Sequence, residues 1–236
     1  FEAYKKVAIA LNGKPVIIRT LDIGGDKEIP YMGLEKDENP FLGYRAIRLC
    51  LDRKEDIYKP QLRALLRASA YGNIRIMIPL VTCIDELREA KALIEEIKAE
   101  LDEKNIAYKK DIQVGIMVET AAASLIADIF AKEADFFSIG TNDLTQYTMS
   151  VDRGNKKLSY LYSTFNPAVL RSIRHIIACG REAGIMVGMC GEAASDPMMI
   201  PLLLAFGLNE FSMSASAILR ARKMVTEYSV EELQAV

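Results

Sequence analysis

The sequence predicts an α/β fold, with a TIM-like (β/α)8 barrel as the expected architecture. Short, near-continuous runs of Val, Ile, Met and Phe recur along the chain, as is typical of strands that are buried on both faces of a parallel sheet. Longer amphipathic stretches lie between these runs, with apolar residues at three- and four-residue spacing, as expected of helices. This alternation of strand and helix favours a parallel sheet over separate α and β regions.

The pattern predicts six clear strands and a possible seventh. The seventh would lie at 44–48, where two arginines flank small apolar residues. Even then an eight-stranded barrel lacks one strand, and because the chain opens on a helix-like segment, we expect the barrel to be truncated at its N-terminal strand. Periodicity leaves an open sheet of six or seven strands as the alternative. The six clear strands are expected at 16–22, 74–79, 112–120, 136–139, 185–192 and 210–214, and helices at 2–11, 84–105, 121–133, 166–183 and 215–227.

Length and composition indicate one large domain over residues 1–236. Half of the residues are hydrophobic, which is ample for a core, and no Gly/Ser/Pro-rich linker divides the chain. The net charge of −2 gives no global basic footprint for nucleic acid, and the apolar runs are far short of the ~20 residues of a membrane span. Four cysteines without CxxC or Cys/His pairing suit a reducing compartment, so we expect a cytoplasmic protein with neither a zinc site nor disulfides.

The segment 135–153, DFFSIGTNDLTQYTMSVDR, is the most informative part of the chain. A buried strand breaks at Gly140 into Thr141-Asn142-Asp143, and the preceding predicted strand ends in Glu119. Two carboxylates at neighbouring strand ends repel each other unless a cation or a shared proton resolves the conflict, and Mg²⁺ accepts one or two carboxylates. The alternative is that Glu119 caps the following helix and Asp143 forms an Asx-turn.

Arg19, Arg45 and Arg153 are candidate phosphate contacts, because guanidinium groups bind phosphate and carboxylate in fork geometry and stay charged. Arg19 is the stronger case, since it interrupts an apolar strand where an unpaired charge would be costly. The alternative for each is a structural salt bridge, such as Arg19–Asp22. For Arg48 we prefer that structural role.

Three further residues are weighed as site candidates. Lys27 follows the flexible pair Gly24-Gly25 and is a weaker phosphate candidate, since this segment is equally compatible with a simple loop. Cys190, in GMCGE, can act as a general acid, because a thiol near its usual pKa is protonated at neutral pH; the alternative is a small buried hydrophobe. His175 lies in a helical pattern and is expected to pack or to face solvent.

Seven motifs follow one another along essentially the whole chain. They are RTLDIGGDKEIPY (19–31), NPFLGYRAIR (39–48), GIMVET (115–120), SIGTNDL (138–144), VDRGN (151–155), GMCGE (188–192) and NEFSMS (209–214). These motifs resemble those of PEP-utilising phosphotransferases, and more specifically the Enzyme I family of the bacterial sugar phosphotransferase system. Pyruvate phosphate dikinase and PEP synthase share some of these elements, but GGDKEIPY and VDRGN favour the Enzyme I family.

The resemblance implies a TIM-like barrel that binds phosphoenolpyruvate (PEP) and Mg²⁺ at its C-terminal face. It implies that Glu119 and Asp143 are the metal ligands and that Cys190 donates a proton to the enolate carbon, giving pyruvate. The phosphoryl group would pass to a histidine on a separate N-terminal domain and then to the carrier protein HPr, and a homodimer is expected. The implied substrate contacts are Arg19, Lys27, Arg45, Asn142, Asp143 and Arg153.

Among the departures from the family pattern, the chain holds no candidate phosphohistidine. His175 lies in a predicted helix and matches no such motif, so the chain is expected to be the PEP-binding part without the N-terminal phosphohistidine domain. Two alternative functions stay open at this point. One is a PEP–pyruvate domain of the dikinase or PEP synthase type, and the other is a non-catalytic PEP-sensing dimerisation module.

Overall fold

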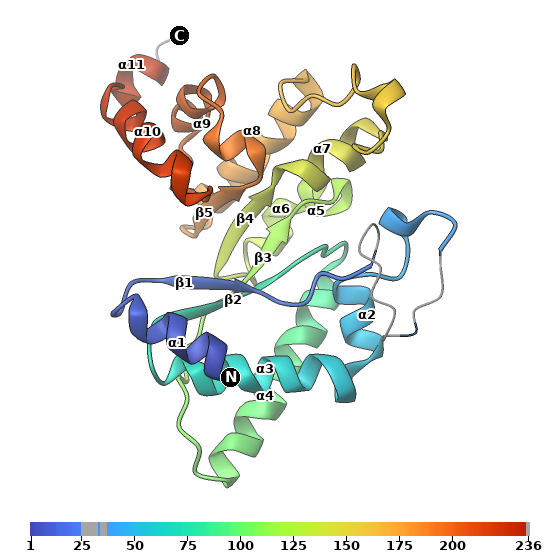
Figure 1. Ribbon diagram of the computed structural model, residues 1–236, viewed down its shortest axis with the longest axis vertical. Helices are drawn as coiled ribbons and strands as arrows, with labels where there is room; N and C mark the ends of the chain where they lie inside the picture. The colour runs from blue at the N-terminus through green and yellow to red at the C-terminus, as the bar shows by residue number, and fades with distance from the viewer. Residues whose placement is uncertain (25–32, 34–36, 235–236) are drawn as a thin grey trace. The chain divides into compact units, whose positions relative to one another are not determined.

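The computed structural model describes residues 1–24, 33 and 37–234, so the predicted phosphate contact Lys27 lies outside the described residues (Figure 1). The described strands form a six-stranded sheet in chain order, β1-β2-β3-β4-β5-β6, and those with a recorded register pair in parallel. Helices follow the strands, which confirms the α/β class and the strand order of a (β/α) barrel. The chain divides into two compact units, residues 1–115 and 116–236, and the expectation of one domain over 1–236 stays a prediction.

The first unit is built on β1 (Val16–Arg19) and β2 (Ile74–Ile78). These strands pair in parallel from Val16↔Ile74 to Arg19↔Met77, and the N–H of Ile76 donates to the carbonyl of Gln113 at 2.9 Å. The long helices α3 and α4 pack against each other and contribute fully buried leucines to the core (Figure 1). The helical elements of this unit are α1 (Glu2–Ala10), η2 (Pro40–Leu42), α2 (Ile47–Asp52), η3 (Lys54–Tyr58), α3 (Lys59–Ser69) and α4 (Ile84–Glu103).

The seventh strand predicted at 44–48 is wrong. Ala46 has a φ of 50°, in the left-handed region that a strand residue does not adopt, and it is the residue that precedes α2. The backbone N–H of Ala46 donates to the carbonyl of Ile23 at 3.1 Å, which holds this turn. The segment 44–48 is therefore a tight turn that leads into α2. The spacing of polar and apolar residues alone does not distinguish such a turn from a short strand.

The second unit carries the C-terminal end of β3 (Val114–Val118) together with β4, β5 and β6. All five residues of β4 are buried, including the polar Ser138. The strand predicted at 210–214 is shorter than expected, since β6 pairs only over two residues, Gly188↔Glu210 and Met189↔Phe211. The bounds are β4 (Phe136–Gly140), β5 (Met186–Cys190), β6 (Glu210–Phe211), α5 (Ala121–Leu125), α6 (Ala127–Phe130), α7 (Thr141–Met149), η4 (Lys156–Leu158), α8 (Pro167–Glu182), η5 (Glu192–Ser195), α9 (Met199–Phe206), α10 (Ala215–Thr226) and α11 (Val230–Gln234).

The helix predicted over 121–133 is two short helices, α5 and α6. Ile126, with φ −110° and ψ 28°, leaves helical geometry between them. The side chain of Thr120 caps α5, because its Oγ1 accepts a hydrogen bond from the N–H of Ala123 at 3.0 Å. The side chain that caps α5 is therefore Thr120 rather than Glu119.

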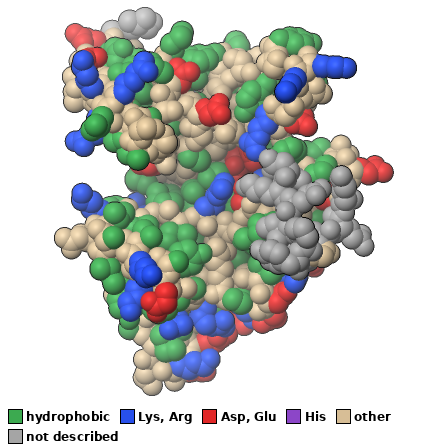
Figure 2. Space-filling view, in the orientation of Figure 1, with side chains coloured by type: hydrophobic (Ala, Val, Ile, Leu, Met, Phe, Trp, Pro, Cys, Tyr) green, Lys and Arg blue, Asp and Glu red, His purple; other side chains and the backbone are tan. Residues whose placement is uncertain are grey.

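The surface carries both signs of charge. On the face shown in Figure 2, acidic and basic side chains are interspersed with apolar ones, in keeping with the net charge of −2. Within the described part of the chain, no helix is both long and apolar enough to cross a membrane.

Candidate active site

The end of β4 places three polar residues at the start of a helix. β4 ends at Gly140 and α7 begins at Thr141 without an intervening loop, so Asn142 and Asp143 occupy the first turn of α7. A carboxylate is favourable there, because the helix N-terminus carries a partial positive charge. Asp143 is nevertheless only 6 % exposed, and a carboxylate that is so well buried needs a partner.

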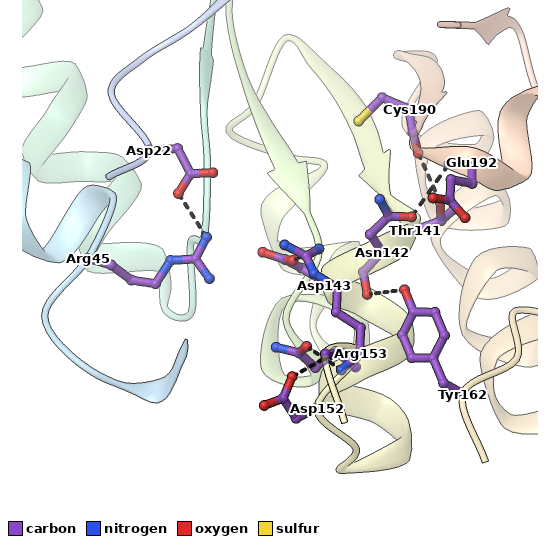
Figure 3. Close-up of polar contacts among 12 residues, drawn as sticks. Asp22, Arg45, Thr141, Asn142, Asp143, Asp152, Arg153, Tyr162, Cys190 and Glu192 are labelled. Atoms are coloured by element: carbon purple, nitrogen blue, oxygen red, sulfur yellow. Dashed lines mark hydrogen bonds and ion pairs between the residues drawn. The ribbon is translucent and has the colours of Figure 1, made fainter. Parts of the chain in front are cut away.

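Arg153 supplies that partner. Its Nη1 donates to Oδ1 of Asp143 at 2.8 Å, and its own backbone N–H donates to Oε1 of Gln146 at 3.0 Å (Figure 3). Ser150, in left-handed geometry with φ 54°, ends α7 and turns the chain back toward the helix. The Arg153 side chain stays 30 % exposed, so the guanidinium is both anchored and accessible.

Glu119 follows β3, the parallel neighbour of β4, with Val118 paired to Ile139. Glu119 is 3 % exposed, and its Oε2 would lie 2.5 Å from a Cβ at Gly140. Only a glycine leaves room for the carboxylate at this place. Glu119 therefore lies against the last residue of β4, three residues before Asp143.

Glu119 and Asp143 are the two carboxylates of the candidate metal site. Among residues 1–24, 33 and 37–234, no three His, Cys, Asp or Glu side chains are arranged to hold a metal ion. Mg²⁺, however, uses one or two protein carboxylates and takes waters and substrate phosphate as its other ligands. Glu119 and Asp143 are two such buried carboxylates, and the absence of a side chain at Gly140 leaves room for Glu119. The residues present therefore fit Mg²⁺.

Cys190 ends β5, directly beside the start of α7. Oγ1 of Thr141 donates to the carbonyl oxygen of Cys190 at 3.0 Å (Figure 3). Oγ of Ser138 lies 3.9 Å from the Cys190 sulfur, as a weak donor. Gly191 has a φ of 97°, and a Cβ on it would lie 2.3 Å from Oγ1 of Thr141. The second glycine of the GMCGE motif, Gly191, is required because the start of α7 lies too close for a side chain.

Asn142 and Tyr162 connect the same region to two loops. Oδ1 of Asn142 accepts a hydrogen bond from the N–H of Glu192 at 3.4 Å, and the hydroxyl of half-buried Tyr162 donates to the carbonyl of Asn142 at 3.1 Å (Figure 3). Burial raises the pKa of Tyr162, and the positive charge of Arg153 partly opposes that rise. The tyrosine is therefore a neutral donor at physiological pH.

The sequence did not single out Tyr162, Thr141 or Ser138 as site residues. Thr141 and Ser138 stand in the SIGTND run, which was the available signal. Tyr162 lies twenty residues from its partner Asn142, and no local sequence pattern predicts that contact.

In the first unit, Asp22 holds two of the predicted phosphate contacts. Its carboxylate pairs with Nη1 of Arg19 at 3.2 Å and with Nη2 of Arg45 at 2.9 Å. The structural salt bridge considered as the alternative for Arg19 is present, and Arg19 is 42 % exposed rather than buried. Arg45 is 3 % exposed. Arg48 has the structural role preferred for it, but through hydrogen bonds: its Nη1 donates to the carbonyls of Leu42 and Gly43.

A pocket of about 250 Å³ lies between α9, β6 and α10. Its walls are apolar side chains that include Phe211 and Ile218, with Arg222 as the charged member. A small, highly charged phosphate ester is poorly matched to such walls, so we place the candidate site at the ends of β3, β4 and β5.

A comparison with protein families identifies the family of the chain. Residues 1–230 match the family model described as "PEP-utilising enzyme, PEP-binding domain". The chain belongs to this family. The membership confirms the family resemblance read from the SIGTND and GMCGE motifs, and those motifs are the ones that form the polar cluster around Asp143 and Cys190.

Curated relatives in the family carry one shared name. The chain is similar to the phosphoenolpyruvate-protein phosphotransferases of Priestia megaterium (54 % identity), Geobacillus stearothermophilus (57 %) and Bacillus subtilis strain 168 (56 %). The alignments cover 98–99 % of this chain but 40–41 % of each relative. The chain thus spans about two fifths of the length of these relatives.

Solved structures agree on the fold alone. A citrate lyase from Burkholderia xenovorans LB400 superposes with a TM-score of 0.55 at 20 % identity, over 75 % of this chain and 58 % of that one. A malate synthase from Haloferax volcanii gives 0.54 at 13 % identity, over 74 % and 52 %. At such identities the likeness supports the architecture and carries no inference about the reaction.

Proposed function

We propose that this chain binds PEP together with Mg²⁺ and supports transfer of the phosphoryl group to a histidine on a separate N-terminal domain, with release of pyruvate. The pairing of Asp143 with Arg153 at the end of β4 is the observation that carries the proposal. It puts a buried carboxylate and an accessible guanidinium side by side, as binding of a cation together with a phosphate requires.

The arginines supply the charge that the substrate needs. PEP carries a phosphate and a carboxylate, and fork-shaped guanidinium groups bind both without losing their own charge. Arg153 is proposed to contact the substrate, and Arg19 and Arg45 remain predicted contacts. Asn142 adds a neutral side-chain amide, whose NH₂ group can donate to the substrate while Oδ1 accepts from Glu192.

Glu119 and Asp143 would hold Mg²⁺. When bound, the ion neutralises negative charge on the substrate oxygens during phosphoryl transfer. Arg153 keeps the carboxylate of Asp143 oriented through the 2.8 Å hydrogen bond. Because Gly140 carries no side chain, the carboxylate of Glu119 also has a defined place.

Cys190 is the proposed proton donor. As the P–O bond of PEP breaks, its electron pair remains on the enolate of pyruvate, and the Cys190 thiol gives its proton to the methylene carbon to complete the methyl group. The remaining thiolate takes a proton from solvent before the next cycle. Cys190, at the end of β5, is only partly buried, in keeping with this role.

The acceptor and the later partners are inferred from the relatives. Their name, phosphoenolpyruvate-protein phosphotransferase, describes transfer from PEP to a protein. This chain aligns with about two fifths of them, so the N-terminal phosphohistidine domain, the carrier HPr and a homodimer are proposed for the whole protein.

Calorimetric titration of PEP into the chain, with and without Mg²⁺, tests the proposal. We expect saturable binding that strengthens when Mg²⁺ is present, because the ion offsets repulsion between the phosphate and the two carboxylates. Binding of equal strength in both titrations would show that Mg²⁺ takes no part in PEP binding. No binding in either titration would contradict the proposed substrate. Sulfate at the same ionic strength is the control for non-specific anion binding.

A further inference from the structure

The loop between α7 and α8 carries Arg153 and is attached to α7 near both of its ends. Near its first end, the Arg153 side chain donates to Asp143 and the Arg153 backbone N–H donates to Gln146. Near its other end, the hydroxyl of Tyr162 donates to the carbonyl of Asn142 at 3.1 Å (Figure 3). Two consecutive residues of α7, Asn142 and Asp143, therefore receive contacts from the two ends of the loop.

The middle of this loop contributes little to the core. Residues 152–161 are exposed, apart from the partly buried Leu158. A second contact at the far end lies beside that of Tyr162, where Oγ1 of Thr164 is 3.3 Å from Oγ1 of the fully buried Thr145. A segment with so few buried contacts of its own opens easily, so the contacts near its ends set its position.

The hydrogen bond of Tyr162 restrains the loop rather than the helix. The first turn of α7 follows β4 directly, and it is fixed by the buried Thr141, whose Oγ1 donates to the carbonyl of Cys190. The carbonyl of Asn142 therefore has a defined place without the tyrosine. The exposed loop has no comparable support, so it is the loop that gains order when the hydroxyl of Tyr162 binds this carbonyl.

The hydroxyl of Tyr162 lies among the charged groups of the candidate active site. Burial raises the pKa of Tyr162, and the positive charge of Arg153 is the largest of the charge effects that act on it. The carboxylates of Glu192 and Asp143 act in the opposite direction to Arg153. Tyr162 is therefore near the guanidinium of Arg153 in space, although nine positions separate the two residues in the chain.

We propose that Tyr162 is a positioning residue of this site, which keeps the loop folded against α7 and thereby holds the Arg153 guanidinium where PEP binds. The inference rests on the proposed function, because it assigns Tyr162 to the same site. Tyr162 acts through Arg153, whose side chain is 30 % exposed and therefore open to a ligand. Loss of the hydroxyl leaves Arg153 charged but less often in place, so PEP affinity falls although no contact with PEP is removed.

Tyr162→Phe tests the proposal, because it removes the hydroxyl and keeps the ring. Calorimetric titration with PEP in Mg²⁺ should show an affinity lower by roughly three- to tenfold, the range of one lost neutral hydrogen bond. Tyr160→Phe is the matched control, since it is the same substitution in the same loop at a side chain that is 77 % exposed, and it should bind PEP as the parent does. Amide hydrogen exchange over 151–164 should be faster in Tyr162→Phe than in Tyr160→Phe.

A double-mutant cycle with Arg153→Lys separates positioning from a general loss of structure. Because Tyr162 acts through Arg153, Tyr162→Phe should weaken PEP binding far less in the Arg153→Lys background than in the parent. Equal losses in both backgrounds, or a Tyr162→Phe variant that binds PEP as Tyr160→Phe does, would overturn the inference and leave the proposed function intact. Weaker binding with unchanged hydrogen exchange would also overturn it, since Tyr162 would then act on PEP directly. Absence of PEP binding in the parent would contradict the proposed function and the inference with it.

Discussion

Arg153 donates a hydrogen bond of 2.8 Å from Nη1 to Oδ1 of Asp143, across ten positions of the chain. The bond joins the loop after α7 to the first turn of that helix. It gives a buried carboxylate its charge partner while the guanidinium stays partly open to solvent. Substrate affinity and the local order of this loop should therefore depend on the same side chain.

Arg153→Lys should weaken PEP binding. A lysine keeps the positive charge but cannot contact Asp143 and a phosphate in the same fork geometry, so we expect a loss of part of the ~1.5–3 kcal/mol of a hydrogen bond to a charged group. Calorimetry of PEP in Mg²⁺ measures the change. Arg181→Lys, at an exposed position of α8, is the control. Parental affinity in Arg153→Lys would make Arg153 a structural residue only.

Thr120→Ala should lower stability by about 1 kcal/mol, the usual cost of an N-cap. Its Oγ1 accepts the Ala123 N–H, which would otherwise be buried without a partner. In a chain of this length the midpoint of thermal unfolding should fall by roughly 2–4 °C. Thr120→Ser keeps the acceptor and should stay within about 0.5 kcal/mol of the parent. Equal losses in both variants would show that the methyl group matters rather than the cap.

Glu210→Gln should stabilise the fold at neutral pH. Burial raises the pKa of Glu210 above its ordinary 4.5, so the folded state binds this proton more tightly than the unfolded chain does. The contribution of Glu210 to stability is then fully present below pH 4.5 and is lost as the pH rises through the folded pKa. Gln has the same size, which the close approach to Gly188 requires.

Denaturant unfolding from pH 4 to 8 would measure this effect. The stability gain of Glu210→Gln should grow with pH, whereas Glu103→Gln, at an exposed position of α4, should show no such trend. A gain that is constant across the range would mean that Glu210 is not a titrating contributor.

Cys190→Ser should separate binding from chemistry. Serine is nearly isosteric and leaves the carboxylates and arginines unchanged, so PEP and Mg²⁺ should still bind. A hydroxyl is a far weaker acid than a thiol, and pyruvate formation should fall by roughly 10²–10⁴ when the phosphohistidine domain is supplied. Pyruvate release followed by a coupled dehydrogenase measures it. Normal turnover in Cys190→Ser would show that Cys190 is a structural residue and not the proton donor.

Much of the fold could be predicted from apolar periodicity. The six clear strands all appear, although β6 is only two residues long because pairing stops at Phe211. Helices α2, α3, α7, α9 and α11 were not predicted. α9 is apolar almost throughout, so it has no polar face to mark its period, and α7 begins directly after β4, where an Asx-turn at Asp143 was the alternative considered.

The candidate site was only partly accessible to sequence reasoning. Asp143 and Arg153 were both singled out, but their mutual contact depends on the turn at Ser150, which no motif specifies. Asp22 was considered as a partner of Arg19 alone, and its closer bond to Arg45 joins residues 23 positions apart. Such contacts are set by strand register and packing rather than by local spacing.

The central claim is that Asp143 joins cation binding to PEP binding, and a PEP titration in Mg²⁺ with Asp143→Asn tests it most directly. The amide keeps the shape of the side chain but removes the charge that attracts the cation and Arg153. Asp152→Asn, in the exposed turn where Oδ1 accepts the Gly154 N–H, is the matched control. We predict that Mg²⁺-dependent PEP binding is lost in Asp143→Asn and kept in Asp152→Asn, with both variants folded. Unchanged Mg²⁺-dependent affinity in Asp143→Asn would contradict the account.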